Sequence, residues 1–81
     1  MNIKVQESAK KDLKKIDKSE AIKILKAIEK LRKYPNTPNI KKLTNFHPPF
    51  RFRVGNYRVL FDIEDDVIIV FNIKHRSKAY E

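Results

Sequence analysis

The chain has 81 residues, of which 41% are hydrophobic, enough for one compact domain over residues 1–81 and too many for a disordered tail. It has no cysteine, no signal-peptide pattern and no apolar run near the ~20 residues of a membrane span, so we expect a soluble, cytoplasmic protein without disulfides. The net charge of +9 favours a polyanionic partner such as nucleic acid, or an acidic protein, although a solvated lysine-rich surface would give the same sum.

The first half of the chain is predicted to form a short strand and two helices. Residues 2–6 alternate apolar and polar side chains, as a strand with one buried face does. Residues 7–16 place apolar side chains at helical spacing, with Ser8 as the cap. Asp17 opens a capping-box pattern, which predicts a second helix that runs to about residue 34, just before a proline.

The second half is predicted to form a linker and then three strands. Residues 35–49 contain all four prolines of the chain. The strands predicted at 49–54 and 57–63 alternate cleanly, whereas 67–74 is apolar at nearly every position, as in a strand covered on both faces. The order β-α-α-β-β-β indicates an α+β fold, with two helices packed on one face of a small, mainly antiparallel sheet.

Three of the five arginines gather on the hairpin formed by the first two of these strands. Gly-Asn at 55–56 is a two-residue turn signal that places Arg53 opposite Arg58. Strand alternation puts both, together with Arg51, on the face opposite the helices. Like charges in such a pair destabilise a sheet, within a range of about 0.2–1 kcal/mol. The cluster therefore favours a phosphate ligand held by guanidinium groups over the alternative that Asp62 and nearby carboxylates neutralise it.

The segment that follows the last strand carries further polar groups suited to such a ligand. Within seven residues it holds Lys74, His75, Arg76, Lys78 and Tyr80. This set offers a proton carrier, an anion clamp and a stacking platform, although polar chain ends are often only frayed. The two histidines, His47 and His75, lie far apart without cysteine, so neither a metal nor another cofactor is expected, and His47 is expected at the surface.

The stretch RFRVGNYRVLFDIEDDVIIVFNIKHRSKAY, residues 51–80, resembles the C-terminal half of the RelE/ParE superfamily of type II toxins. The RelE branch often reads R-x-R-V-G-x-Y-R-V-x-Y, then an acidic turn, an apolar strand, H-R and a tyrosine. The N-terminal order of strand, helix pair and KKL linker is similar too. The resemblance implies a metal-independent endoribonuclease that cuts messenger RNA in the ribosomal A site. It also implies an acidic RelB-like antitoxin, with the toxin monomeric when free and hetero-oligomeric with its antitoxin.

The same resemblance implies a role for each site residue. Arg58 would hold the scissile phosphate, Arg76 would be a second clamp and Tyr80 would orient the nucleotide. Some members carry catalytic lysines where this chain has Arg51 and Arg53, and arginine is a poor general base because it stays protonated. We therefore expect four side chains to bind RNA and assign proton transfer to His75 or Tyr80. The four are Arg51, Arg53, Lys74 and Lys78.

Two alternatives stay open. A ParE-like toxin would bind DNA gyrase without nuclease chemistry, but that branch tends to lack the set Arg58, Arg76 and Tyr80, which this chain keeps. A relic without catalysis would bind only RNA or the antitoxin.

Overall fold

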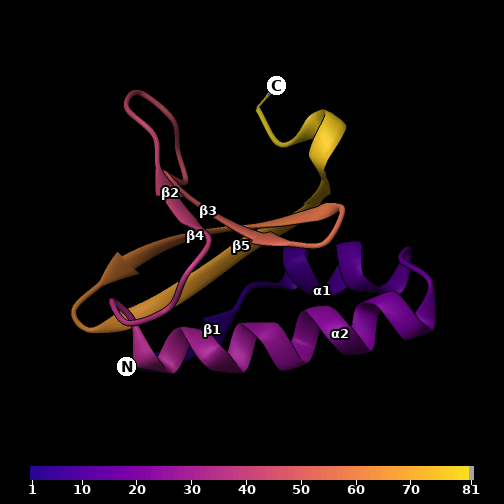
Figure 1. The fold of residues 1–81 in the computed structure, drawn as a ribbon, viewed down its shortest axis with the longest axis horizontal. Helices are drawn as coiled ribbons and strands as arrows, with labels where there is room; N and C mark the ends of the chain where they lie inside the picture. The colour runs from indigo at the N-terminus through magenta and orange to yellow at the C-terminus, as the bar shows by residue number, and fades with distance from the viewer. Residues whose placement is uncertain (81) are drawn as a thin grey trace.

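The computed structural model describes residues 1–80, in which five strands form one sheet with two helices against one face (Figure 1). The order across the sheet is β1-β5-β4-β3-β2. The pair β1 and β5 is parallel, and the three other neighbouring pairs are antiparallel. The predicted α+β class and the mainly antiparallel sheet are confirmed. Within residues 1–80, no helix is long and apolar enough to cross a membrane.

The two α-helices, α1 (Glu7–Lys14) and α2 (Lys18–Glu29), begin close to the predicted positions. Two 3₁₀ turns, η1 (Lys30–Lys33) and η2 (Arg76–Lys78), are also present, and η2 was not predicted. The second helix was predicted to reach about residue 34, and its last turn is 3₁₀ rather than α-helical.

The two predicted helix caps have different outcomes. Asp17 caps α2 as predicted, because its carboxylate accepts a hydrogen bond from the backbone N–H of Ser19 at 3.2 Å. Ser8 does not cap α1, since the residue that precedes this helix is Gln6. The Ser8 hydroxyl instead donates to the carbonyl of Phe71 and so ties α1 to the sheet.

The three predicted C-terminal strands are confirmed to within one residue at each end. The strands of the sheet are β1 (Asn2–Val5), β2 (Ile40–Lys42), β3 (Phe50–Val54), β4 (Tyr57–Glu64) and β5 (Val67–His75). Strand β2 was not predicted, because three residues in a proline-rich segment show no alternation. Its backbone pairs with the edge of β3, with Lys41 opposite Arg51.

The register of the β3–β4 hairpin is the predicted one, with Arg53 opposite Arg58 and Val54 opposite Tyr57. The turn needs its glycine, since Gly55 has a φ of +57°, a conformation that costs other residues energy. The helix-facing side of the hairpin is buried: Val59 and Phe61 are fully covered. The arginines therefore lie on the face that the helices do not cover.

Strand β5 was predicted to be covered on both faces. It has a neighbouring strand on each side, but its two faces are not both fully covered. Ile68 and Val70 are buried in the core, whereas Ile69 and Phe71 are only half-buried. The register against β4 shifts between Leu60 and Phe61, so that one extra residue of β5 bulges out of the ladder. The continuous apolar run thus reflects an interior strand with a bulge, because α1 and α2 both lie against the other face of the sheet (Figure 1).

Replacing Asp17 by alanine should lower the thermal midpoint at neutral pH, whereas Asp17→Asn should keep most of the cap. Hydrogen bonds from the Ser19 side chain and backbone hold the pKa of Asp17 below its usual value. The carboxylate therefore contributes stability that is present above pH ~4 and is lost as the pH falls through the lowered pKa. Thermal unfolding between pH 2 and 7 should show a smaller difference between parent and Asp17→Ala at the acidic end. An equal difference throughout would contradict this account.

Candidate functional site

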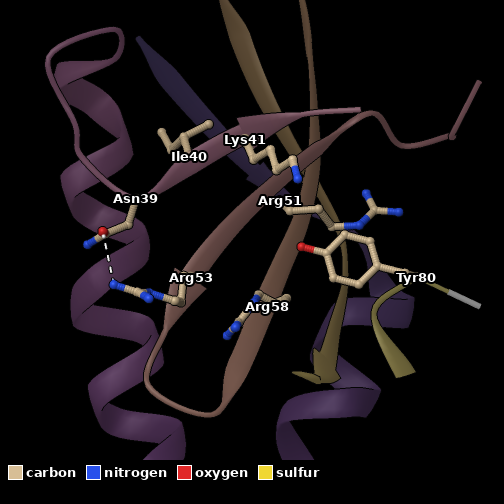
Figure 2. A pocket seen from close by; sticks show the side chains of 7 residues that line it. All are labelled: Asn39, Ile40, Lys41, Arg51, Arg53, Arg58 and Tyr80. Carbon is tan, nitrogen blue, oxygen red and sulfur yellow. Dashed lines mark hydrogen bonds between the residues drawn. The ribbon is translucent and has the colours of Figure 1, made fainter. Parts of the chain in front are cut away.

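A cavity of about 330 Å³ opens on the arginine-bearing face of the sheet (Figure 2). Strands β2, β3 and β4 supply most of its wall, and the C-terminal segment closes one side. Its lining contains four cationic side chains and no carboxylate from residues 1–80. The lining residues are Asn39, Ile40, Lys41, Arg51, Arg53, Arg58 and Tyr80.

Arg53 and Arg58 face each other across the hairpin and present guanidinium groups to this cavity. Arg58 Nη1 donates to the carbonyls of Gly55 and Tyr57 at 3.1 and 3.0 Å, which orients the side chain along the turn. Arg53 is exposed, and its Nη2 lies 3.5 Å from the Asn39 side-chain oxygen. Their remaining N–H groups are available to an anion, because neither side chain forms a salt bridge within residues 1–80.

Arg51 differs from the other two arginines because it is buried, with only 4% of its surface exposed. Its Nε donates to the carbonyl of Ala79 at 3.0 Å, and its Nη1 donates to the carbonyls of Pro48 and Phe50. Burial lowers the pKa of the Arg51 guanidinium from its usual value, and Tyr80 opposes that effect. Arg51 was predicted to bind RNA, and in the structure it donates three hydrogen bonds to backbone carbonyls, which favours a structural role.

Arg51 also places Tyr80 over the cavity. The guanidinium carbon lies 5.8 Å from the centre of the Tyr80 ring, a distance typical of a cation–π contact. The neighbouring Ala79 is buried, at 2% exposure, whereas Tyr80 remains 47% exposed. The ring is thus held at the rim by a buried anchor, with one side free to stack against a base.

The four other predicted site residues do not line the cavity. Lys74 pairs with Arg58 across β4 and β5, so it lies on the arginine face one strand further from the cavity. Arg76 and Lys78 are exposed in η2. The backbone N–H of Arg76 donates to the carbonyl of Asn56 at 2.8 Å, which fixes η2 against the hairpin turn.

His75 lies on the other side of the sheet from the arginines. It pairs with Tyr57, whose ring centre is 5.6 Å from the imidazole, and Tyr57 packs against the helix-covered core. The His75 Nδ1 accepts a hydrogen bond from the backbone N–H of Ser77 at 3.3 Å and so caps η2. The structure therefore separates this imidazole from the cationic cavity.

Three cavity residues were not predicted from the sequence to belong to the site: Asn39, Ile40 and Lys41. They belong to the predicted linker, and β2 pairing brings them beside β3. Asn39 has a φ of +67°, and its carbonyl accepts a hydrogen bond from Arg53 N–H at 2.9 Å. Such a short edge strand shows no pattern of its own in the sequence, because its position depends on hydrogen bonds to the edge of β3.

The alternative that acidic residues neutralise the arginine cluster finds no support in the described part of the chain. Asp62 accepts a hydrogen bond from the backbone N–H of Ile63, and one of its carboxylate oxygens lies 3.9 Å from His47 Nε2 rather than beside an arginine. His47 is exposed, as predicted. Within residues 1–80, no group of three or more His, Cys, Asp or Glu side chains is arranged to hold a metal ion.

Comparison with known proteins defines the family to which this fold belongs. The sequence profile described as ParE toxin of type II toxin–antitoxin system, parDE, matches residues 3–80, and the chain belongs to this family. The chain is 40% identical over 43 residues to Toxin RelE3 of Methanocaldococcus jannaschii, a match to 53% of this chain and 49% of that relative. The match thus spans about half the length of that curated relative.

Solved structures show the same fold over nearly the whole chain. The RelB–RelE antitoxin–toxin complex from Methanococcus jannaschii matches with a TM-score of 0.77 and 29% identity, covering 95% of this chain and 94% of that one. The RelE–RelB complex from Pyrococcus horikoshii OT3 matches with a TM-score of 0.70 and 24% identity, over 96% and 97% of the two chains. The chain is thus a toxin of the RelE/ParE superfamily.

Proposed function

We propose that this protein is an mRNA interferase, a metal-independent endoribonuclease that cleaves messenger RNA on the ribosome. The observation that carries the proposal is the cavity, where four cations and Tyr80 meet without a carboxylate from residues 1–80. Such a site suits a phosphodiester flanked by an unstacked base, because guanidinium groups bind phosphate oxygens and aromatic rings stack on bases.

Cleavage would proceed by attack of a ribose 2′-hydroxyl on its own 3′-phosphate, giving a cyclic phosphate and a free 5′-hydroxyl. Negative charge builds on the non-bridging oxygens in the transition state. Arg58 is the residue we assign to that charge, because two backbone carbonyls orient its guanidinium before substrate arrives. Tyr80 would orient the nucleotide by stacking, from the position that Arg51 gives it.

The residues outside the cavity would act on the rest of the RNA. Arg76 begins η2 beside the hairpin turn, so we assign it to a phosphate next to the scissile one. Lys74 and Lys78 would add charge for backbone phosphates along the same edge. His75 caps η2, and its place across the sheet supports a part in holding that turn rather than in proton transfer.

The cognate partner we propose is an acidic antitoxin of the RelB kind. The solved relatives from two archaea are complexes of RelE with RelB. A net charge of +9 and an uncompensated cationic cavity would favour an acidic segment laid over this face. The toxin would then be blocked by occupation of the site that binds RNA.

The matched profile is that of ParE toxins, which favours gyrase poisoning as a second candidate. One experiment separates the two. The purified protein is added to ribosomes stalled on a defined message and, separately, to a DNA gyrase supercoiling assay. The nuclease proposal expects cleavage in the A-site codon, with a cyclic phosphate and a 5′-hydroxyl, and unchanged supercoiling. Inhibited supercoiling with an intact message would favour the ParE-like function.

Arg53→Ala should weaken binding to ribosome-bound message. It should also make the slope of log K against log salt shallower by ~0.7 to 0.9, the value for one lost phosphate contact. The physical reason is that Arg53 is exposed and would bind a backbone phosphate rather than the reacting one. The saturated cleavage rate should change little. Binding titrations at 50–200 mM salt check this. An unchanged slope would place Arg53 outside the RNA contact.

A further inference from the structure

The cavity holds few groups that can give up a proton. Three of its four cations are arginines, which stay protonated at any working pH and so act only as fixed charges. Asn39 and Ile40 do not titrate. Of the lining side chains from residues 1–80, only Lys41 and Tyr80 can transfer a proton to a reacting oxygen.

Lys41 is placed to reach a substrate in this cavity. It lies on the edge strand β2, directly opposite Arg51, and its exposed side chain extends toward Arg51 and Tyr80 (Figure 2). Lys41 forms no salt bridge within residues 1–80. Its flexible stem and three N–H donors let the ammonium follow the substrate, unlike the anchored Arg51.

The adjacent lysine on the strand differs in position. The ammonium of Lys42 lies 5.6 Å from the centre of the Phe50 ring, and Phe50 belongs to the core on the helix-covered face. Lys42 does not line the cavity. The two lysines have the same charge and neighbouring positions, so they form a matched pair for experiment.

We propose that Lys41 is the general acid of RNA cleavage, the group that protonates the leaving 5′-oxygen. The inference rests on the proposed nuclease function. As the 2′-oxygen bonds to phosphorus, the bond from phosphorus to the 5′-oxygen breaks and its electron pair stays on that oxygen. The Lys41 ammonium gives this oxygen its proton. The 2′-hydroxyl proton passes to solvent water, and the Lys41 amine regains a proton from solvent.

Charge favours this assignment. Four cationic side chains line the same cavity, and like charges repel each other. Proton donation turns Lys41 neutral at the moment when the phosphate loses its link to the leaving group. The remaining arginines keep the positive charge that the phosphate oxygens need. The Tyr80 ring lies over the Arg51 guanidinium and suits stacking on a base.

The test compares two messages on stalled ribosomes under single-turnover conditions. One message is ordinary RNA, and the other carries sulfur in place of the leaving 5′-oxygen. A thiolate leaves without a proton, because a thiol has a pKa of about 8.5, far below that of an alcohol. The variants are Lys41→Ala, Lys41→Arg, the matched control Lys42→Ala and Tyr80→Phe, which keeps the ring but removes the hydroxyl.

On the ordinary message, Lys41→Ala and Lys41→Arg should each lower the cleavage rate about 10²-fold or more. On the sulfur message both should cleave within a few-fold of the parent rate. Lys42→Ala should match the parent on both messages. Full activity of Lys41→Arg on ordinary RNA would show that Lys41 contributes only positive charge, and would overturn the proposal. An equal loss of cleavage rate on both messages would overturn it too. Sulfur rescue of Tyr80→Phe instead of Lys41→Ala would make Tyr80 the donor.

The nuclease function and the assignment of Lys41 fail in different ways. If the parent protein cleaves neither message, the nuclease function is wrong and the assignment falls with it. If the parent cleaves ordinary RNA and Lys41→Ala does so equally fast, only the assignment of Lys41 is wrong.

Discussion

Replacing Arg58 by alanine should lower the single-turnover rate of message cleavage about 10²–10³-fold. The guanidinium lines the cavity and is held by the carbonyls of Gly55 and Tyr57, so it would meet the developing phosphate charge without reorganisation. Arg58→Lys should recover only part of the rate, because an ammonium keeps the charge but loses the planar fork. The measurement is cleavage of a defined message on stalled ribosomes.

Stability separates loss of chemistry from loss of fold in this variant. Arg58 faces Arg53 across the hairpin, so alanine relieves a repulsion and the free energy of unfolding should not fall by more than about 0.5 kcal/mol. Arg32→Ala is a matched control for the loss of one arginine side chain, because Arg32 pairs with Glu29 at 2.7 Å and does not line the cavity. Cleavage by Arg58→Ala at the parent rate would rule out the proposed mechanism.

Replacing Arg51 by alanine should lower the free energy of unfolding by about 2–3 kcal/mol. The substitution removes the donor to three backbone carbonyls and empties a buried position. Urea denaturation measures the loss. Arg53→Ala is the comparison on the same strand, and because Arg53 is exposed its free energy of unfolding should change by no more than about 0.5 kcal/mol.

The Arg51 variant should also release the C-terminal segment. Arg51 bonds to the carbonyl of Ala79 and lies beside the Tyr80 ring, so its loss should speed amide exchange in residues 76–80. Cleavage should fall as well, because Tyr80 loses its fixed position. Unchanged stability together with unchanged amide exchange would show that Arg51 does not anchor the C-terminal segment. The prediction that Arg51 binds phosphate would then be favoured again.

The hairpin and its two faces follow from local patterns in the sequence. A two-residue turn with glycine and two alternating runs allow one register, since a slip of one residue would turn every apolar side chain to solvent. That register placed Arg53 opposite Arg58 and Phe61 in the core, as the structure confirms. The Asp17 cap was likewise predictable from the sequence, because a helix cap depends only on neighbouring residues.

The assembly of the site, in contrast, depends on which segments pack together in the folded chain. Strand β2 forms because the edge of β3, the next strand in the chain, offers it hydrogen bonds, and no alternation within residues 40–42 predicts that Lys41 lines the cavity. Arg51 belongs to the same alternation as Arg53, yet the returning C-terminal segment covers it and takes up its hydrogen bonds. His75 and Tyr80 belong to the same short polar segment, yet pairing with Tyr57 places His75 on the other side of the sheet, whereas Tyr80 lines the cavity. Such outcomes depend on contacts between distant segments, which periodicity within one segment does not encode.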